Sequence, residues 1–82
     1  MSATTYFIHG TGEDNTIGAV DGSMNAMRAS SFLLGNNNQM LPVSKCLELI
    51  SLFPDKDFVS EDLVKELKEL PSDEKVGVSI DF

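Results

Sequence analysis

The strand expected over residues 4–9 constrains the fold most. It is rich in β-branched and aromatic residues and stops at Gly10. Side chains alternate along a strand, so Tyr6 and Ile8 point to one face while Phe7 points to the other. Large apolar groups on both faces favour a central strand that is covered on both sides.

The last residues of the sequence predict a second strand. Apolar and small or polar residues alternate strictly over 76–82, which places Val76, Val78, Ile80 and Phe82 on the inner side. We expect this strand to pair with the first, and to offer an edge for pairing with another chain. A short further strand is indicated over 16–20.

Helical spacing covers the middle of the chain. One segment, 24–34, reads as a helix in which Met24, Met27, Ser31 and Leu34 form one stripe, widened by Ala26, Ala29 and Leu33. The Asp21-Gly22 turn leaves open the alternative of a hairpin between residues 16–20 and 24–28. A second helix is predicted over 43–53; it is apolar nearly all round, which is typical of a helix at an interface or between other elements. A third, 61–70, has Ser60 as its N-cap and ends at Pro71.

Together these patterns predict one small domain over residues 1–82. Its fold class is α+β, or small α/β, with a two- to three-stranded sheet formed by the N- and C-terminal strands and about three helices packed on it.

Charge limits the classes of partner. Thirteen acidic residues face six basic ones, for a formal net charge of −7. Nucleic acid and anionic membrane surfaces are disfavoured, because binding phosphates requires Lys and Arg. A basic protein, including one that normally holds nucleic acid, is an electrostatically suitable partner.

The sequence also bears on location. It has a single cysteine, Cys46, which excludes a disulfide within the chain and fits a reducing compartment. No signal peptide is recognisable, and no apolar run approaches the ~20 residues that span a bilayer. We therefore expect a soluble cytoplasmic protein.

The leading hypothesis is a non-enzymatic protein-interaction or inhibitor module that acts through its negative surface. Helical spacing gathers three acids on one side of the third helix, and two more lie in a loop near the N-terminus. The partner-binding residues predicted on this basis are Asp62, Glu66, Glu69, Glu13 and Asp14.

The alternative is a small-ligand binder that uses the loop over 10–15, at the interface of an oligomer. Backbone N–H groups of a glycine-rich loop can cradle phosphate. The side-chain oxygens of Glu13, Asp14, Asn15 and Asp21 can ligate a divalent cation. The residues predicted for this alternative are His9, Gly10, Thr11 and Gly12.

An enzyme is the least favoured class. His9 is the only histidine and no Gly-x-Ser-x-Gly sequence is present, so a nucleophile and its base are not recognisable. Cys46 lies on an apolar helix, where cysteine is usually inert. We expect no cofactor and no metal, and the sequence leaves a homo-oligomer open.

Overall fold

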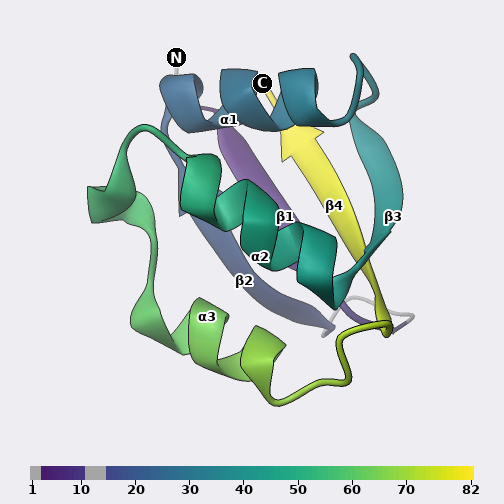
Figure 1. Ribbon diagram of the computed structural model, residues 1–82. Coiled ribbons are helices and arrows are strands. Elements are labelled where there is room, and N and C mark those ends of the chain that lie inside the picture. Colours follow the sequence, from purple (N-terminus) through teal and green to yellow (C-terminus); the bar gives the residue numbers. More distant parts are fainter. Residues whose placement is uncertain (1–2, 11–14) are drawn as a thin grey trace.

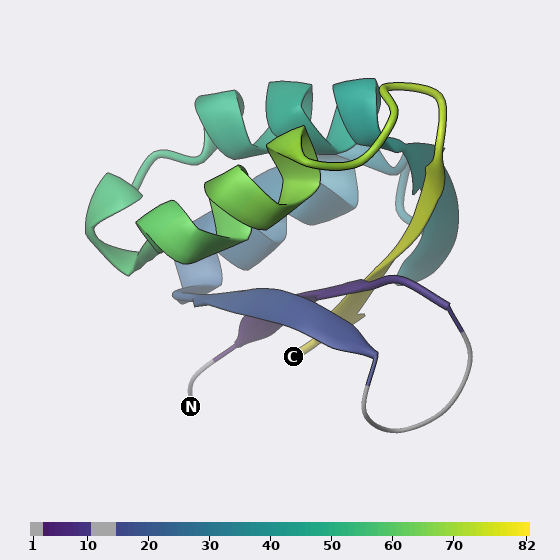
Figure 2. The same ribbon diagram turned by 90° about the horizontal axis from the view of Figure 1, so that it is seen from below.

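The computed structural model describes residues 3–10 and 15–82 as a two-layer α+β fold (Figure 1). One layer is a four-stranded antiparallel sheet. The other consists of the helices, which lie on one side of the sheet in Figure 2. The elements in chain order are β1 (Thr4–Ile8), β2 (Thr16–Asp21), α1 (Ser23–Phe32), β3 (Asn38–Pro42), α2 (Val43–Leu52), the 3₁₀ helix η1 (Lys56–Phe58), α3 (Glu61–Lys68) and β4 (Lys75–Asp81).

The strand order is β2-β1-β4-β3. The predicted pairing of the first and last strands is confirmed, with Phe7 opposite Val78. The predicted number of strands, two to three, is too low. The missing strand is β3, whose Asn38, Gln39 and Pro42 are poor strand formers and which is held by pairing with β4.

The last strand is not an edge. β4 lies between β1 and β3, so the edges of the sheet are β2 and β3. The expectation that β4 offers an edge for self-association is therefore wrong. It fails because the sequence did not reveal β3, which covers that edge.

Only one face of the sheet carries helices, and the expectation that β1 is covered on both sides is also wrong (Figure 2). Phe7 and Thr5 are fully buried beneath the helices, whereas Tyr6 and Ile8 on the far face are half-buried. Side chains of β1's neighbours, such as Ala19 of β2, complete that face without a covering layer.

The helices α2 and α3 pack as their apolar spacing predicts. Leu63 and Leu67 of α3 are buried, and α2 buries Val43, Cys46, Leu49 and Ile50. The apolar surface of α2 is therefore covered mostly within the chain. Leu52, at 43% exposed, is its uncovered apolar residue.

Residues 23–32 form a helix rather than a hairpin, but α1 buries only part of the expected stripe: Ala26, Ala29 and Leu33 are buried, whereas its methionines are not. Asn25, Ala26 and Ala29 are buried, while Met24 and Met27 are each 59% exposed. The small alanines let α1 approach the sheet closely, and the methionines lie on the solvent side.

Asn25 explains this orientation. Its buried amide nitrogen donates to the backbone oxygens of Asp21 (3.0 Å) and Asp55 (2.9 Å). Its side-chain oxygen accepts from the backbone N–H of Asp55 at 2.9 Å. These three bonds satisfy a buried amide and fasten α1 to the loop after α2.

The end of α1 is a Schellman motif. Gly35 N–H donates to Ser30 O at 2.8 Å and Leu34 N–H donates to Ser31 O at 3.1 Å. The left-handed position that such a motif requires is taken by Leu34, with φ of 57°, rather than by glycine. Leu34 is also 91% exposed.

A membrane-spanning helix is not found. Among residues 3–10 and 15–82, no helix has the length and apolar content needed to cross a bilayer.

Candidate functional site

The helix that carries most of the predicted partner-binding residues is confirmed. Ser60 caps α3 with its hydroxyl, which accepts from Asp62 N (3.0 Å) and Leu63 N (3.4 Å). Leu63 and Leu67 anchor α3 on the sheet side, so the opposite side faces solvent. Asp62, Glu66 and Glu69 are all exposed, and Glu69 is the C-cap.

The acids of this helix continue into the neighbouring segments. Residues 55–74 contain eight acidic residues and three lysines. We call the exposed carboxylates of this segment the acidic surface. Its members are Asp57, Glu61, Asp62, Glu66, Glu69, Asp73 and Glu74.

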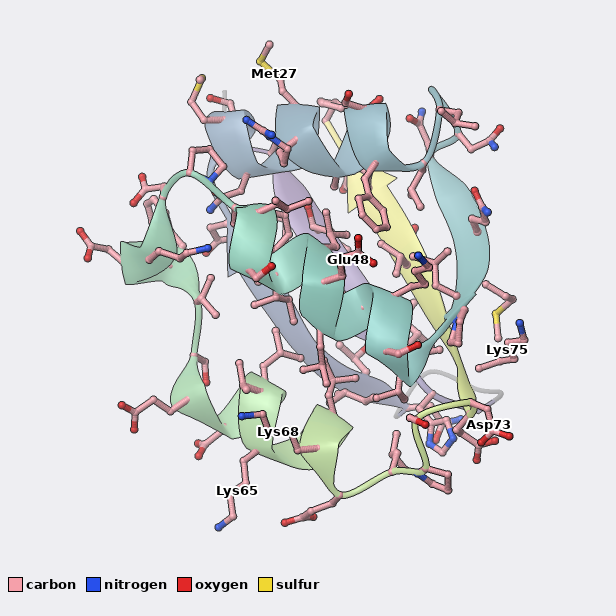
Figure 3. All side chains as sticks on the ribbon, in the orientation of Figure 1. Met27, Glu48, Lys65, Lys68, Asp73 and Lys75 are labelled. Atoms are coloured by element: carbon pink, nitrogen blue, oxygen red, sulfur yellow. The ribbon has the colours of Figure 1, made fainter. Side chains whose placement is uncertain are left out.

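One contact joins the acidic surface to the end of β1. His9 Nε2 lies 3.2 Å from Glu74 Oε2, across 65 positions of sequence. Asp73 lies at this same end of the molecule in Figure 3. The turn before β4 thus adds carboxylates beside the point where the chain leaves β1, a placement that the sequence could not show.

The lysines of α3 lie among these acids. Lys65 and Lys68 are exposed on the helix, as Figure 3 shows, and dilute its negative charge. Among the residues that the structure describes, neither lysine forms an ion pair, and Glu74 is the acid of the surface that does. The remaining carboxylates of the acidic surface are therefore available to a partner.

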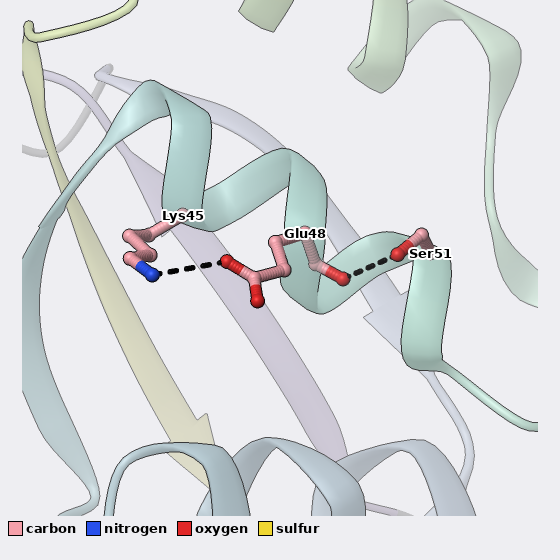
Figure 4. A network of polar contacts seen from close by, with 3 residues as sticks. All are labelled: Lys45, Glu48 and Ser51. Carbon is pink, nitrogen blue, oxygen red and sulfur yellow. Dashed lines mark hydrogen bonds and ion pairs between the residues drawn. The ribbon is translucent and has the colours of Figure 1, made fainter.

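Two acids outside this surface have side-chain partners within the chain. Glu48 Oε2 accepts from Lys45 Nζ at 3.1 Å on α2, and the backbone oxygen of Glu48 accepts from the Ser51 hydroxyl (Figure 4). Asp21 Oδ1 accepts from the Thr4 hydroxyl at 2.8 Å. These two acids belong to other elements than α3 and its adjoining turns, Asp21 to β2 and Glu48 to α2.

The loop residues of both hypotheses are only partly described. Glu13 and Asp14 of the partner-binding set, and Thr11 and Gly12 of the ligand-binding set, lie outside the described residues. The two that are described, His9 and Gly10, stand at the end of β1.

His9 and Gly10 have clear local roles. The His9 backbone N–H donates to Asn15 O at 2.9 Å, which brings the two sides of the loop together. Gly10 has φ of +95°, a conformation that favours glycine. A phosphate at His9 would meet the Glu74 carboxylate.

Of the four residues suggested for a cation site, Glu13 and Asp14 lie outside the described residues, and the other two lie apart. Asp21 lies at the far end of β2 from Asn15, and six strand residues span about 20 Å. Asp21 therefore cannot join Asn15 in one coordination sphere. Within residues 3–10 and 15–82, no group of three or more His, Cys, Asp or Glu side chains could hold a metal ion.

Cys46 is fully buried on α2. Burial raises the pKa of its thiol to about 11. The thiol is therefore protonated at neutral pH, which disfavours nucleophilic chemistry at this position.

A pocket of about 420 Å³ lies at α1, away from the site residues predicted from the sequence. Its lining residues are Met24, Met27, Arg28, Ser31 and Pro54. One feature of the sequence distinguishes the segment that contains α1. Residues 22–47 contain no acidic residue, although the chain has thirteen. The contribution of Pro54 from a distant loop is marked by no such feature.

Comparisons with protein families, with curated proteins and with solved structures found no significant match to this chain. Its candidate sites are therefore judged from their geometry and charge.

Proposed function

We propose that this protein is a non-enzymatic interaction module that binds a basic protein partner through the acidic surface. The observation that carries this proposal is the segregation of charge on the folded chain. Most of the exposed carboxylates among the described residues lie on α3 and the adjoining turns, whereas residues 22–47 have none.

The contact centres on Asp62, Glu66 and Glu69, which are exposed and without ion-pair partners among the described residues. The proposed binding residues also include Glu13 and Asp14, which lie outside the described residues. Complementary charge across such an interface accelerates encounter and selects basic partners.

The chemistry of the surface suggests how it inhibits. A row of carboxylates on a rigid helix can occupy the Lys and Arg side chains of a protein that otherwise bind phosphates. A module of this kind competes with nucleic acid for the partner and does not bind nucleic acid itself.

The test is capture followed by a salt titration. The wild-type protein and a Glu66→Lys/Glu69→Lys variant are immobilised, and proteins from the source cell that only the wild type retains are purified. Affinity for such a protein should fall about tenfold in the double variant, since each exposed charge pair contributes a few tenths to 1 kcal/mol and reversal adds repulsion. Raising salt from about 50 to 300 mM should weaken wild-type binding as well.

The matched control is Asp81→Lys/Glu48→Lys, which makes the same change in net charge outside the acidic surface. It should retain the partner with nearly wild-type affinity. The proposal fails if both double variants lose binding equally, or if affinity does not respond to salt.

A further inference from the structure

The outer face of α1 reverses the usual arrangement of an amphipathic helix. Met24, Met27, Arg28 and Ser31 recur at the spacing of one helical face, and all are exposed. Met27 projects away from the body of the molecule in Figure 3. We call these four residues the α1 outer face.

The pocket at this face lies between α1 and the loop that follows α2. Pro54 forms the wall opposite α1. It stands between Phe53, which is 1% exposed, and Asp55, whose backbone N–H and C=O both bond the buried Asn25 of α1. The loop that carries Pro54 is therefore held against α1, which places Pro54 beside the methionines in an open pocket of about 420 Å³.

The charge of this face is opposite to that of the rest of the chain. Arg28 is the one arginine in the sequence, and residues 22–47 contain no acid. Among the described residues, the Arg28 guanidinium has no hydrogen-bond or ion-pair partner. Methionine and arginine are both enriched at the centre of protein interfaces, which fits the residues exposed on α1.

Charge also decides what covers the face. A second copy packed α1 against α1 in a two-fold symmetric dimer would bring two Arg28 side chains together, and residues 22–47 have no acid to neutralise them. A partner helix that carries a carboxylate would pair with Arg28 while its apolar side chains contact the methionines. The α1 helix is about 15 Å long, enough for roughly three turns of such a helix.

From these observations we propose that the α1 outer face docks an amphipathic helix of a partner protein, with an aliphatic side chain in the pocket and an acidic side chain at Arg28. This is a second surface, distinct from the acidic surface and of opposite sign. The proposal does not depend on the function proposed above.

The test uses three synthetic peptides of about 16 residues, long enough to form helix on binding. The first has leucines at helical spacing flanked by glutamates. The second replaces the glutamates with lysines, and the third replaces the leucines with serines. Each is titrated into the ¹⁵N-labelled protein. The glutamate peptide should shift the amide resonances of residues 24–31 and Asp55, and the serine peptide should not.

Charge reversal sharpens the test. Arg28→Glu should weaken the glutamate peptide about tenfold, whereas Lys65→Glu, with the same change in net charge on α3, should alter it less than about twofold. Raising salt should not weaken this complex, because the peptide and the chain repel one another at long range.

Three outcomes would overturn the proposal. One is that no peptide shifts residues 24–31. Another is that glutamate and lysine peptides shift them equally. The third is that these resonances move with protein concentration in the absence of peptide, which would identify a second copy as the occupant.

Discussion

The segments 22–47 and 55–74 each pack a helix against the same sheet, yet they present opposite surfaces. The first has two basic residues and no acid, and it exposes Met24 and Met27 on α1. The second has eight acids and exposes them on and around α3. One small fold thus separates an apolar, weakly positive face from a strongly negative one.

The two helices also use their apolar residues differently. On α3 the large side chains Leu63 and Leu67 face the sheet, and charge faces water. On α1 the alanines face the sheet, and the large methionines face water. Stability accounts for the first arrangement, but it does not account for exposed methionines, which points to α1 as a binding face.

The largest expected effect contrasts these two faces. Leu67→Ala should lower the free energy of unfolding by about 3 kcal/mol, because it leaves a cavity in the core. Met27→Ala should change it by less than about 0.5 kcal/mol, because the side chain lies in solvent. Urea unfolding followed by circular dichroism measures both. Equal losses would show that the α1 face is buried.

The next effect tests what fixes α1 in this orientation. Asn25→Ala removes three hydrogen bonds and leaves the buried N–H of Asp55 unsatisfied, so we expect a loss of about 2–3 kcal/mol. Asn37→Ala, at an exposed position, serves as the control and should cost less than about 0.5 kcal/mol. A loss at Asn25 no greater than the control would contradict the role given to this side chain.

A smaller effect, of opposite sign, is expected in the core that both helices share. The Thr5 hydroxyl is buried on β1 without a hydrogen-bond partner among the described residues. Thr5→Val should therefore stabilise the protein by about 1 kcal/mol. Thr4→Val should not, because the Thr4 hydroxyl donates to Asp21. Thermal unfolding of the two variants compares them, and stabilisation by both would refute this explanation.

The smallest expected change in the free energy of unfolding comes from Leu34, in the turn that ends α1. Leu34→Gly should stabilise by about 0.5–1 kcal/mol, because glycine adopts the left-handed conformation without steric cost. Leu34→Ala keeps the Cβ and should give no gain. A gain from both variants would assign the effect to the exposed side chain instead of the backbone.

Predictions from the sequence succeeded where an element depends on neighbouring residues and failed where it depends on residues far apart in the chain. The α3 helix was predictable because its signals are local: Ser60 at the start, Pro71 after the end, and leucines between. The face of α1 was not, since methionines and alanines recur with the same period. The choice depends on Asn25 meeting Asp55, 30 positions away.

Two other features also depend on distant contacts. The strand β3 has weak strand formers and is held by its pairing with β4. The pocket needs Pro54 placed beside α1 by a separate loop. The acidic surface could be predicted in part. Helical spacing predicted its centre on α3, whereas the His9–Glu74 contact joins segments 65 positions apart and could not be predicted.

The central claim is that a basic partner binds at α3 and the adjoining acidic turns. The most direct measurement is an amide chemical-shift map of the labelled protein with a captured basic partner, at low and at high salt. Our account predicts the largest shifts within residues 57–74, with affinity falling as salt rises. Largest shifts at the edge of β3 or at α1, unchanged by salt, would contradict it.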